Sequence, residues 1–148
     1  MKKLFQTQDD AVGLILRVIL GIVFFPHGMQ KLLGWFGGYG FSGTMGFFTG
    51  MMGVPAVFAV LAILAEGLGC LGLISGFMTR IAAFGIAMNM AVAVYMIHFK
   101  YGFFMNWTGK QAGEGIEYHL LVIGIATALM IRGGGKWSID KVIAERLT

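Results

Sequence analysis

Four apolar stretches, each close to the length of a membrane-crossing helix, constrain the fold of this chain more than any other feature. They cover about residues 10–33, 54–77, 79–99 and 115–131. A helix needs roughly 20 apolar residues to cross about 30 Å of hydrocarbon. The sequence therefore predicts an all-α integral membrane protein, a four-helix bundle that crosses the bilayer four times.

The composition supports a membrane location. Only 12% of the residues are charged and 57% are hydrophobic, whereas soluble domains carry about 25% charged residues. A soluble chain of 148 residues cannot bury so much apolar surface. The lipid bilayer is thus the expected partner. The net charge of +4 does not indicate nucleic acid, because the basic residues flank the apolar stretches.

The distribution of basic residues predicts the orientation, since cytoplasmic loops of membrane proteins are enriched in Lys and Arg. With four spans, both termini lie on one side of the membrane. That side would carry Lys2, Lys3, Arg80, Arg132, Lys136, Lys141 and Arg146. The opposite side would carry only Lys31, Lys100 and Lys110. We therefore expect both termini to be cytoplasmic.

Two further segments are predicted at the membrane surfaces. The glycine-rich loop after the first span suggests an interfacial helix over about residues 42–52. The tail alternates apolar and charged residues, which predicts an amphipathic helix over about 138–147 with Ser138 as its N-cap. Asp9 or Asp10 is the expected N-cap of the first span, and Thr79 that of the third.

Two polar residues are expected at the same depth in the membrane interior. With a rise of 1.5 Å per helical residue, Glu66 lies about 16 Å and Asn89 about 15 Å from the cytoplasmic edge. Glu66 is the only charged residue between Pro55 and Phe77, and a charge at the bilayer centre costs at least about 2.5–3.5 kcal/mol. We therefore expect Glu66 to face the interior. Gly69, Gly72 and Gly76 would let another helix approach closely.

The histidines form a second set at one depth. His27, His98 and His119 all lie about 25–28 Å from the cytoplasmic edge, on three different helices. Side chains lean toward the N-terminus of their own helix, so Glu66 and His27 are predicted to lean toward each other. Arg17, at about 10 Å, leans away from Glu66, which argues against a direct pair between them.

The order of these features resembles the DoxX family of small four-helix bacterial membrane proteins. The matching segments are "RVILGIVFFPHGMQKLLG", "EGLGCLGLISGFMTR", "EYHLLV" and "GGGKWSID". The resemblance implies a multi-pass protein of the bacterial inner membrane, in a family named after a thiosulfate:quinone oxidoreductase subunit. The polar set that it implies is Arg17, His27, Gly28, Lys31, Glu66 and Arg80.

Each candidate residue has a functional and a structural interpretation. Glu66 and His27 are the candidate catalytic residues, which would handle protons; Glu66 could instead only bond to Asn89 or a backbone carbonyl. The expected substrate-binding residues are Arg17, Lys31, Asn89, His98, Glu117 and His119. Their structural alternatives are a snorkelling Arg17, Lys31 as an interfacial anchor, Asn89 as a helix–helix contact, a solvated Glu117 and loop-bonded histidines. No metal site is predicted, because a shared depth does not establish the ligand geometry that a metal needs.

Together these expectations predict that the protein is a membrane component of a quinone-linked redox system. It would bind a small hydrophobic molecule in an outer-leaflet pocket. The chain has one cysteine, Cys70, and no CxxC or dinucleotide-binding motif, so a redox partner protein or a diffusible quinone would hold the electrons; haem or a metal is less favoured. Two alternatives are a proton-coupled carrier, which would form a homo-oligomer, and a scaffold subunit without a site.

Overall fold

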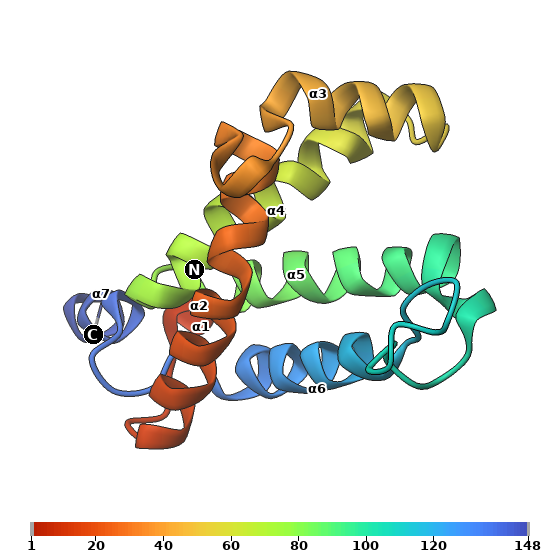
Figure 1. The fold of residues 1–148 in the computed structure, drawn as a ribbon. Coiled ribbons are helices and arrows are strands. Elements are labelled where there is room, and N and C mark those ends of the chain that lie inside the picture. The colour runs from red at the N-terminus through yellow and green to blue at the C-terminus, as the bar shows by residue number, and fades with distance from the viewer. Residues whose placement is uncertain (1, 148) are drawn as a thin grey trace.

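The computed structural model describes residues 2–147, and within them every regular element is a helix (Figure 1). This confirms the predicted all-α class for the described part of the chain. The long helices are α2 (Ala11–Leu33), α4 (Ala56–Ser75), α5 (Thr79–Ala93) and α6 (Glu117–Arg132). Beyond Ala93, α5 continues through a π turn (Val94–His98) and a 3₁₀ turn (Phe99–Tyr101). The four predicted spans coincide with these helices.

Three of the helical segments are long and apolar enough to cross a membrane. They are Ala11–Leu33, Ala56–Ser75 and Thr79–Tyr101. The fourth predicted span, α6, has 16 regular residues, which is shorter than the roughly 20 that a full crossing needs. The structure thus supports a membrane protein directly through three helices.

The short helices lie at the two ends of the molecule. The predicted interfacial segment consists of α3 (Gly40–Gly46) and a π turn (Phe47–Met51). The small helix α1 (Lys2–Phe5) contacts α7 (Ile139–Arg146), so the two chain ends come together. We call this end the terminal end; the opposite, far end carries α3 and the loop of residues 102–116 (Figure 1).

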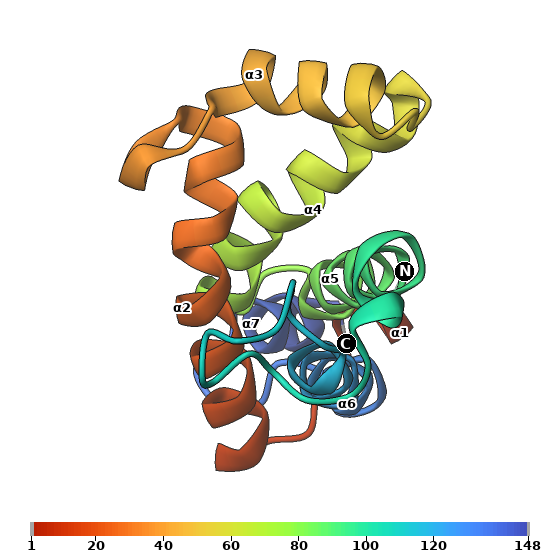
Figure 2. The same cartoon turned by 45° about the vertical axis from the view of Figure 1, so that its right-hand side comes forward.

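The four long helices pack as two pairs that diverge. The first pair is α2 with α4, the second is α5 with α6, and α4 also packs on α5. Figures 1 and 2 show the pairs meeting near the terminal end and running apart toward the far end. In these views the two helix pairs lie at a wide angle to each other.

Glycines bring α2 against its neighbours at close range. A Cβ atom at Gly21 would lie 2.7 Å from a side-chain carbon of Ile74 and 3.1 Å from the Cys70 carbonyl oxygen. A Cβ atom at Gly13 would lie 2.8 Å from the Gly135 nitrogen. The contacts under 3.0 Å are shorter than real Cβ atoms show, so the absence of a side chain at these positions lets the helices approach.

Arg17 joins three parts of the terminal end. Its side chain is buried (2% exposed) and donates hydrogen bonds to five backbone carbonyl oxygens at 2.5–3.2 Å. Two belong to the last turn of α4, at Leu73 and Ile74. The others belong to the loop before α7, at Gly134, Lys136 and Trp137. The structural alternative, in which Arg17 snorkels to lipid head-groups, was therefore wrong.

The start of α5 is capped from another helix. Asp140 of α7 is 1% exposed, and its carboxylate accepts hydrogen bonds from the backbone N–H groups of Met78 and Thr79 at 2.7 and 2.8 Å. These are among the N–H groups that a helix start leaves without partners. Thr79 was expected to cap this helix and does not, since its hydroxyl is buried without a hydrogen-bond partner.

The other predicted caps are present. Asp10 caps α2 by accepting from the Gly13 N–H at 2.8 Å. That hydrogen bond and the nearby Arg132 guanidinium hold the pKa of Asp10 below its ordinary value. Ser138 caps α7 by accepting from the Lys141 N–H at 3.2 Å.

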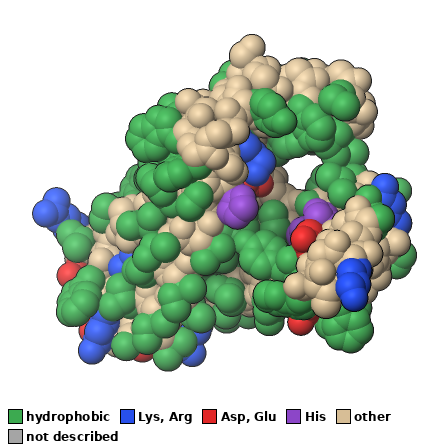
Figure 3. All heavy atoms as spheres, viewed as in Figure 1, with side chains coloured by type: hydrophobic (Ala, Val, Ile, Leu, Met, Phe, Trp, Pro, Cys, Tyr) green, Lys and Arg blue, Asp and Glu red, His purple; other side chains and the backbone are tan. Residues whose placement is uncertain are grey.

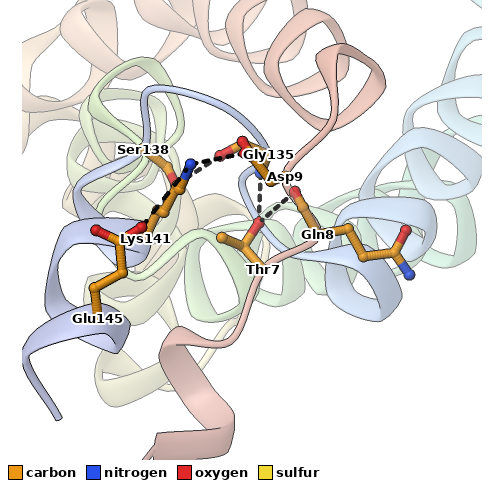
Figure 4. Close-up of polar contacts among 7 residues, drawn as sticks. All are labelled: Thr7, Gln8, Asp9, Gly135, Ser138, Lys141 and Glu145. Atoms are coloured by element: carbon orange, nitrogen blue, oxygen red, sulfur yellow. Dashed lines mark hydrogen bonds and ion pairs between the residues drawn. The ribbon is translucent and has the colours of Figure 1, made fainter. Parts of the chain in front are cut away.

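A network of polar contacts ties the segment before α2 to the start of α7 (Figure 4). The Thr7 hydroxyl accepts a hydrogen bond from the Gly135 N–H at 2.6 Å. The Lys141 ammonium lies 2.9 Å from the Asp9 carboxylate, and this contact raises the pKa of Lys141 above its ordinary value. The terminal end is therefore closed by side chains from both chain ends.

Candidate functional site

Glu66 lies on α4 in the interior of the protein. It is 6% exposed, and its Oε2 atom lies 2.6 Å from Nζ of Lys31. The Lys31 side chain is 27% exposed, so the pair has one buried and one partly accessible member. A buried carboxylate with one basic partner satisfies the expectation that Glu66 faces the protein rather than lipid.

Gly28 explains how Lys31 reaches Glu66. A Cβ atom at Gly28 would lie 2.6 Å from the backbone oxygen of Glu66 and 2.8 Å from Cα of Gly67, so α2 crosses α4 at this point. Lys31 follows Gly28 by about one helical turn and therefore lies on the same face of α2. The spacing of Gly28 and Lys31 in "HGMQK" thus positions the ammonium group beside the carboxylate.

Asn89 adds a third helix to the site. Its Nδ2 donates to the Ala62 carbonyl oxygen at 2.8 Å and to Oε1 of Glu66 at 3.3 Å. Asn89 therefore acts as a helix–helix contact between α5 and α4, which agrees with the structural interpretation of this residue. It also holds one carboxylate oxygen while Lys31 holds the other.

Tyr118 on α6 is a polar residue that the sequence reasoning missed. Its hydroxyl is buried without a hydrogen-bond partner of normal geometry. The available signal was its position one residue before His119 in "EYHLLV". Side chains from α2 and α5 therefore hold the carboxylate on α4: Lys31, Glu66 and Asn89 form what we call the polar cluster.

A recess of about 270 Å³ lies next to the polar cluster, and Lys31 forms part of its wall. It is lined by Gln30, Lys31, Gly37, Gly38, Tyr39, Thr44, Phe47 and Phe48. Figure 3 shows an opening between the segment at the top and the body below, with histidine, basic and acidic side chains at its edges. Ionisable groups thus meet a space that is accessible from outside the protein.

His27 does not contact Glu66. It is exposed, and its ring packs against Phe24 with ring centroids 6.2 Å apart. Among the described residues it forms no hydrogen bond or ion pair. The carboxylate partner on α2 is Lys31, which lies one turn further along the helix.

His98 and His119 come together, as two of the three histidines that were predicted at one depth. Their ring centroids are 4.1 Å apart with the planes tilted by 41°. Nδ1 of His98 lies 2.8 Å from the Glu114 carbonyl oxygen, while His119 is 6% exposed. This pair lies at the far end, where α5 and α6 are joined by the loop of residues 102–116.

The other two predicted site residues have structural contacts. The Glu117 carboxylate accepts from the Met105 N–H at 3.1 Å and so holds the loop before α6. Arg17 bonds the carbonyl groups of the terminal end, away from the polar cluster. Within residues 2–147, no group of three or more His, Cys, Asp or Glu side chains is arranged to hold a metal ion.

The Gly28 contact leads to a stability prediction. Gly28→Ala should lower the thermal unfolding temperature, because the new Cβ meets backbone atoms of Glu66 and overpacking costs about 1–3 kcal/mol. Unfolding can be followed by the reaction of a thiol-specific fluorophore with Cys70, which is a free buried cysteine. Gly124→Ala in α6 is the matched control, since its Cβ would meet nothing within 4 Å. Equal unfolding temperatures for the two variants would contradict the prediction.

Comparison with known proteins identifies related sequences. The family model described as DoxX matches residues 12–99, which include Lys31, Glu66 and Asn89. "Putative oxidoreductase CatD" of Bacillus subtilis (strain 168) is 33% identical over 116 residues, 78% of this chain and 76% of that protein. "Inner membrane protein YqjF" of Escherichia coli (strain K12) is 28% identical over 151 aligned residues, 99% of each chain. No solved structure matches.

Proposed function

The chain belongs to the DoxX family, and from this premise we propose that it is an inner-membrane component of a redox system. In this proposal it binds a small hydrophobic molecule of the quinone class beside the polar cluster. The printed names of two relatives, "Putative oxidoreductase CatD" and "Inner membrane protein YqjF", support the general setting. The chemistry is argued from the chain's own residues below.

The observation that carries the proposal is the ion pair of Lys31 and Glu66, at 2.6 Å beside a recess. Ionisable residues inside a membrane protein are rare, and they commonly mark a pathway or a binding site. A purely structural contact between α2 and α4 would not need charges, because the glycine contact at Gly28 already brings the helices together. The charged pair is therefore best explained by a ligand.

The recess suits a ligand with a single small ring and a long apolar tail. Its volume of about 270 Å³ is near the lower end of ligand pockets, which start at about 300 Å³. A quinone head-group would fit there while its tail stayed in lipid. The Lys31 ammonium can donate a hydrogen bond to a quinone carbonyl, and the three aromatic side chains of the recess can pack on the ring.

Quinone reduction gives the polar cluster a chemical role. A quinone takes up two electrons and two protons to become a quinol. The chain has one cysteine, so a reduced partner protein would supply the electrons. Glu66, after taking a proton from water, would pass it to one ring oxygen, and water would supply the proton for the other. Lys31 would hold the first oxygen and stabilise the negative charge that develops on it.

The same proposal includes four crossings with cytoplasmic termini. Both chain ends lie at the terminal end of the molecule (Figure 1), which an even number of crossings requires. The basic residues of α7 and of the α5 start belong to that end, as expected for a cytoplasmic face. In this arrangement α6 is the fourth span, and α3 lies at the outer surface.

The test is the identity of small molecules that remain bound after mild purification. We expect mass spectrometry to find a quinone with the wild-type protein and at least tenfold less with Glu66→Gln. Thr127→Val is the control, because the Thr127 hydroxyl is exposed and bonds only to its own helix; it should retain the wild-type amount.

Other outcomes would favour the alternatives. A retained polar solute, with flux into proteoliposomes that is lost in Glu66→Gln, would indicate a proton-coupled carrier. Retention of a partner protein without any small molecule, unchanged in Glu66→Gln, would indicate a scaffold subunit. Either result would contradict the quinone proposal.

A further inference from the structure

The loop before α7 and one face of α7 carry apolar side chains that the protein leaves uncovered. Trp137 is 83% exposed, and Ile139, Val142 and Leu147 are 44–49% exposed. Trp137, Ile139 and Val142 line a groove of about 350 Å³. The recess beside the polar cluster is lined by other residues, so the proposed function does not account for this surface.

The backbone at Trp137 is strained. Its φ angle is +54°, in the left-handed region that residues with bulky side chains rarely adopt, whereas glycine adopts it readily. The Arg17 guanidinium holds this turn by donating a hydrogen bond to the Trp137 carbonyl oxygen at 3.0 Å. The exposed indole gains little from packing within the protein. A strained position of this kind suggests a functional role for the residue, here a contact outside the protein.

The helix α7 lies across the ends of the spans. Figure 1 shows α7 nearly along its own axis, whereas α5 and α6 are seen from the side. The Asp140 carboxylate fixes this arrangement by accepting hydrogen bonds from the Met78 and Thr79 N–H groups at the start of α5. A helix set crosswise at the ends of membrane spans runs along the membrane surface, where an amphipathic helix buries its apolar face in the head-group region.

Basic side chains accompany this apolar face. Lys3, Lys136 and Arg146 are exposed, and the ion pairs that the structure describes at this end use other basic residues. Of the acidic residues of α7, Asp140 is buried and Glu145 is exposed. Figure 3 shows basic and hydrophobic side chains together on the side of the molecule where α7 lies. An apolar surface with an excess of positive charge matches anionic phospholipids.

We propose that Trp137 and the apolar face of α7 bind anionic phospholipids of the leaflet next to the terminal end. The side chains of Trp137, Ile139 and Val142 enter between the lipid head-groups, and those of Lys136 and Arg146 contact the phosphates. An acidic protein surface would match the charges equally well, but the crosswise position of α7 at the ends of the spans favours lipid. The inference depends on neither the recess nor a quinone.

Tryptophan fluorescence in vesicles with brominated lipids tests the proposal, because bromine quenches an indole only at close range. The protein would carry Trp35→Phe and Trp107→Phe, both at exposed positions, so that Trp137 is its single tryptophan. The vesicles would contain equal amounts of phosphatidylcholine and phosphatidylglycerol, with bromine on the acyl chains of one or the other. We expect brominated phosphatidylglycerol to quench Trp137 at least twice as strongly as brominated phosphatidylcholine.

Charge variants in the same background test the basic residues. Lys136→Gln/Arg146→Gln should remove the preference for phosphatidylglycerol while both brominated lipids still quench Trp137. Both positions are exposed, so the variant should fold. Lys110→Gln, at an exposed lysine of the far-end loop, is the matched control and should keep the preference.

Three results would overturn the inference. If neither lipid quenches Trp137, the surface faces water or a protein partner. If both lipids quench it equally in the single-tryptophan protein, the surface does not select anionic lipid. If the preference survives in Lys136→Gln/Arg146→Gln, these charges do not bind the phosphates. Quinone retention is measured separately, so a lack of quinone with the lipid preference intact would contradict only the proposed function.

Discussion

Arg17→Met is expected to lower the free energy of unfolding by about 3–5 kcal/mol, because it leaves five backbone carbonyl groups without their donor. Each buried acceptor that loses its partner costs about 1–3 kcal/mol, and the loss of a buried charge offsets part of the sum. The Cys70 thiol assay in detergent would record the change as an earlier onset of labelling. We also expect the loop before α7 to become accessible to proteases, since three of the five carbonyls belong to it.

Two controls separate the geometry of Arg17 from its charge. Arg17→Lys keeps the charge but has one nitrogen in place of a planar fork, so it should recover only part of the stability. Arg146→Met removes an exposed arginine and should change the stability by less than about 0.5 kcal/mol. If Arg17→Met unfolds like Arg146→Met, the contacts of Arg17 are not needed to hold the terminal end together.

The helices could be predicted from the sequence because their signals are local. Runs of apolar residues, together with Asp10 and Ser138 as caps, specify where α2 and α7 begin. The start of α5 shows the limit of this reasoning. Thr79 is a suitable N-cap by type, but the cap comes from Asp140, 61 residues further along the chain. A contact of this kind depends on how α7 folds back, which no local pattern records.

Arg17 shows that the depth of a residue along its helix does not predict which groups its side chain contacts. Counting residues along α2 places it about 10 Å from the cytoplasmic edge, close enough for a long side chain to reach lipid head-groups. In the structure the loop that contains Gly134 lies beside α2, and the Gly134 carbonyl oxygen accepts a hydrogen bond from the Arg17 guanidinium. The sequence contains those glycines but does not show where their loop lies.

The candidate site was predicted in part. Depth alone placed Glu66 and Asn89 together, and they share a hydrogen bond. It also placed His98 and His119 at one level with His27, and the rings of His98 and His119 lie 4.1 Å apart. The partner of Glu66 on α2 was predicted as His27 from the lean of the side chains, but the contact is with Lys31. Because α2 and α4 cross at Gly28, the rotation and tilt of each helix decide which side chain meets the carboxylate, and neither can be read from spacing along one helix.

Lys31→Met is expected to destabilise the protein more than Glu66→Gln, by about 2–3 kcal/mol against about 1 kcal/mol, because the two members of the pair differ in burial. Without Lys31, a carboxylate with 8% of its side chain exposed keeps only the Asn89 amide. Without the charge of Glu66, the Lys31 ammonium can turn toward water, since 27% of its side chain is already exposed. The Cys70 labelling assay would rank the two variants by unfolding temperature.

The double variant Lys31→Met/Glu66→Leu then separates structure from chemistry. Replacing both members of a buried ion pair by apolar residues is often neutral for stability, so the double variant should unfold near the wild-type temperature. Lys141→Met, which removes the more exposed pair with Asp9, is the control for losing a charge and should behave like wild type. If the ion pair exists to bind quinone, the double variant will be stable and will retain none; if it retains the wild-type amount, the charges are not needed for binding.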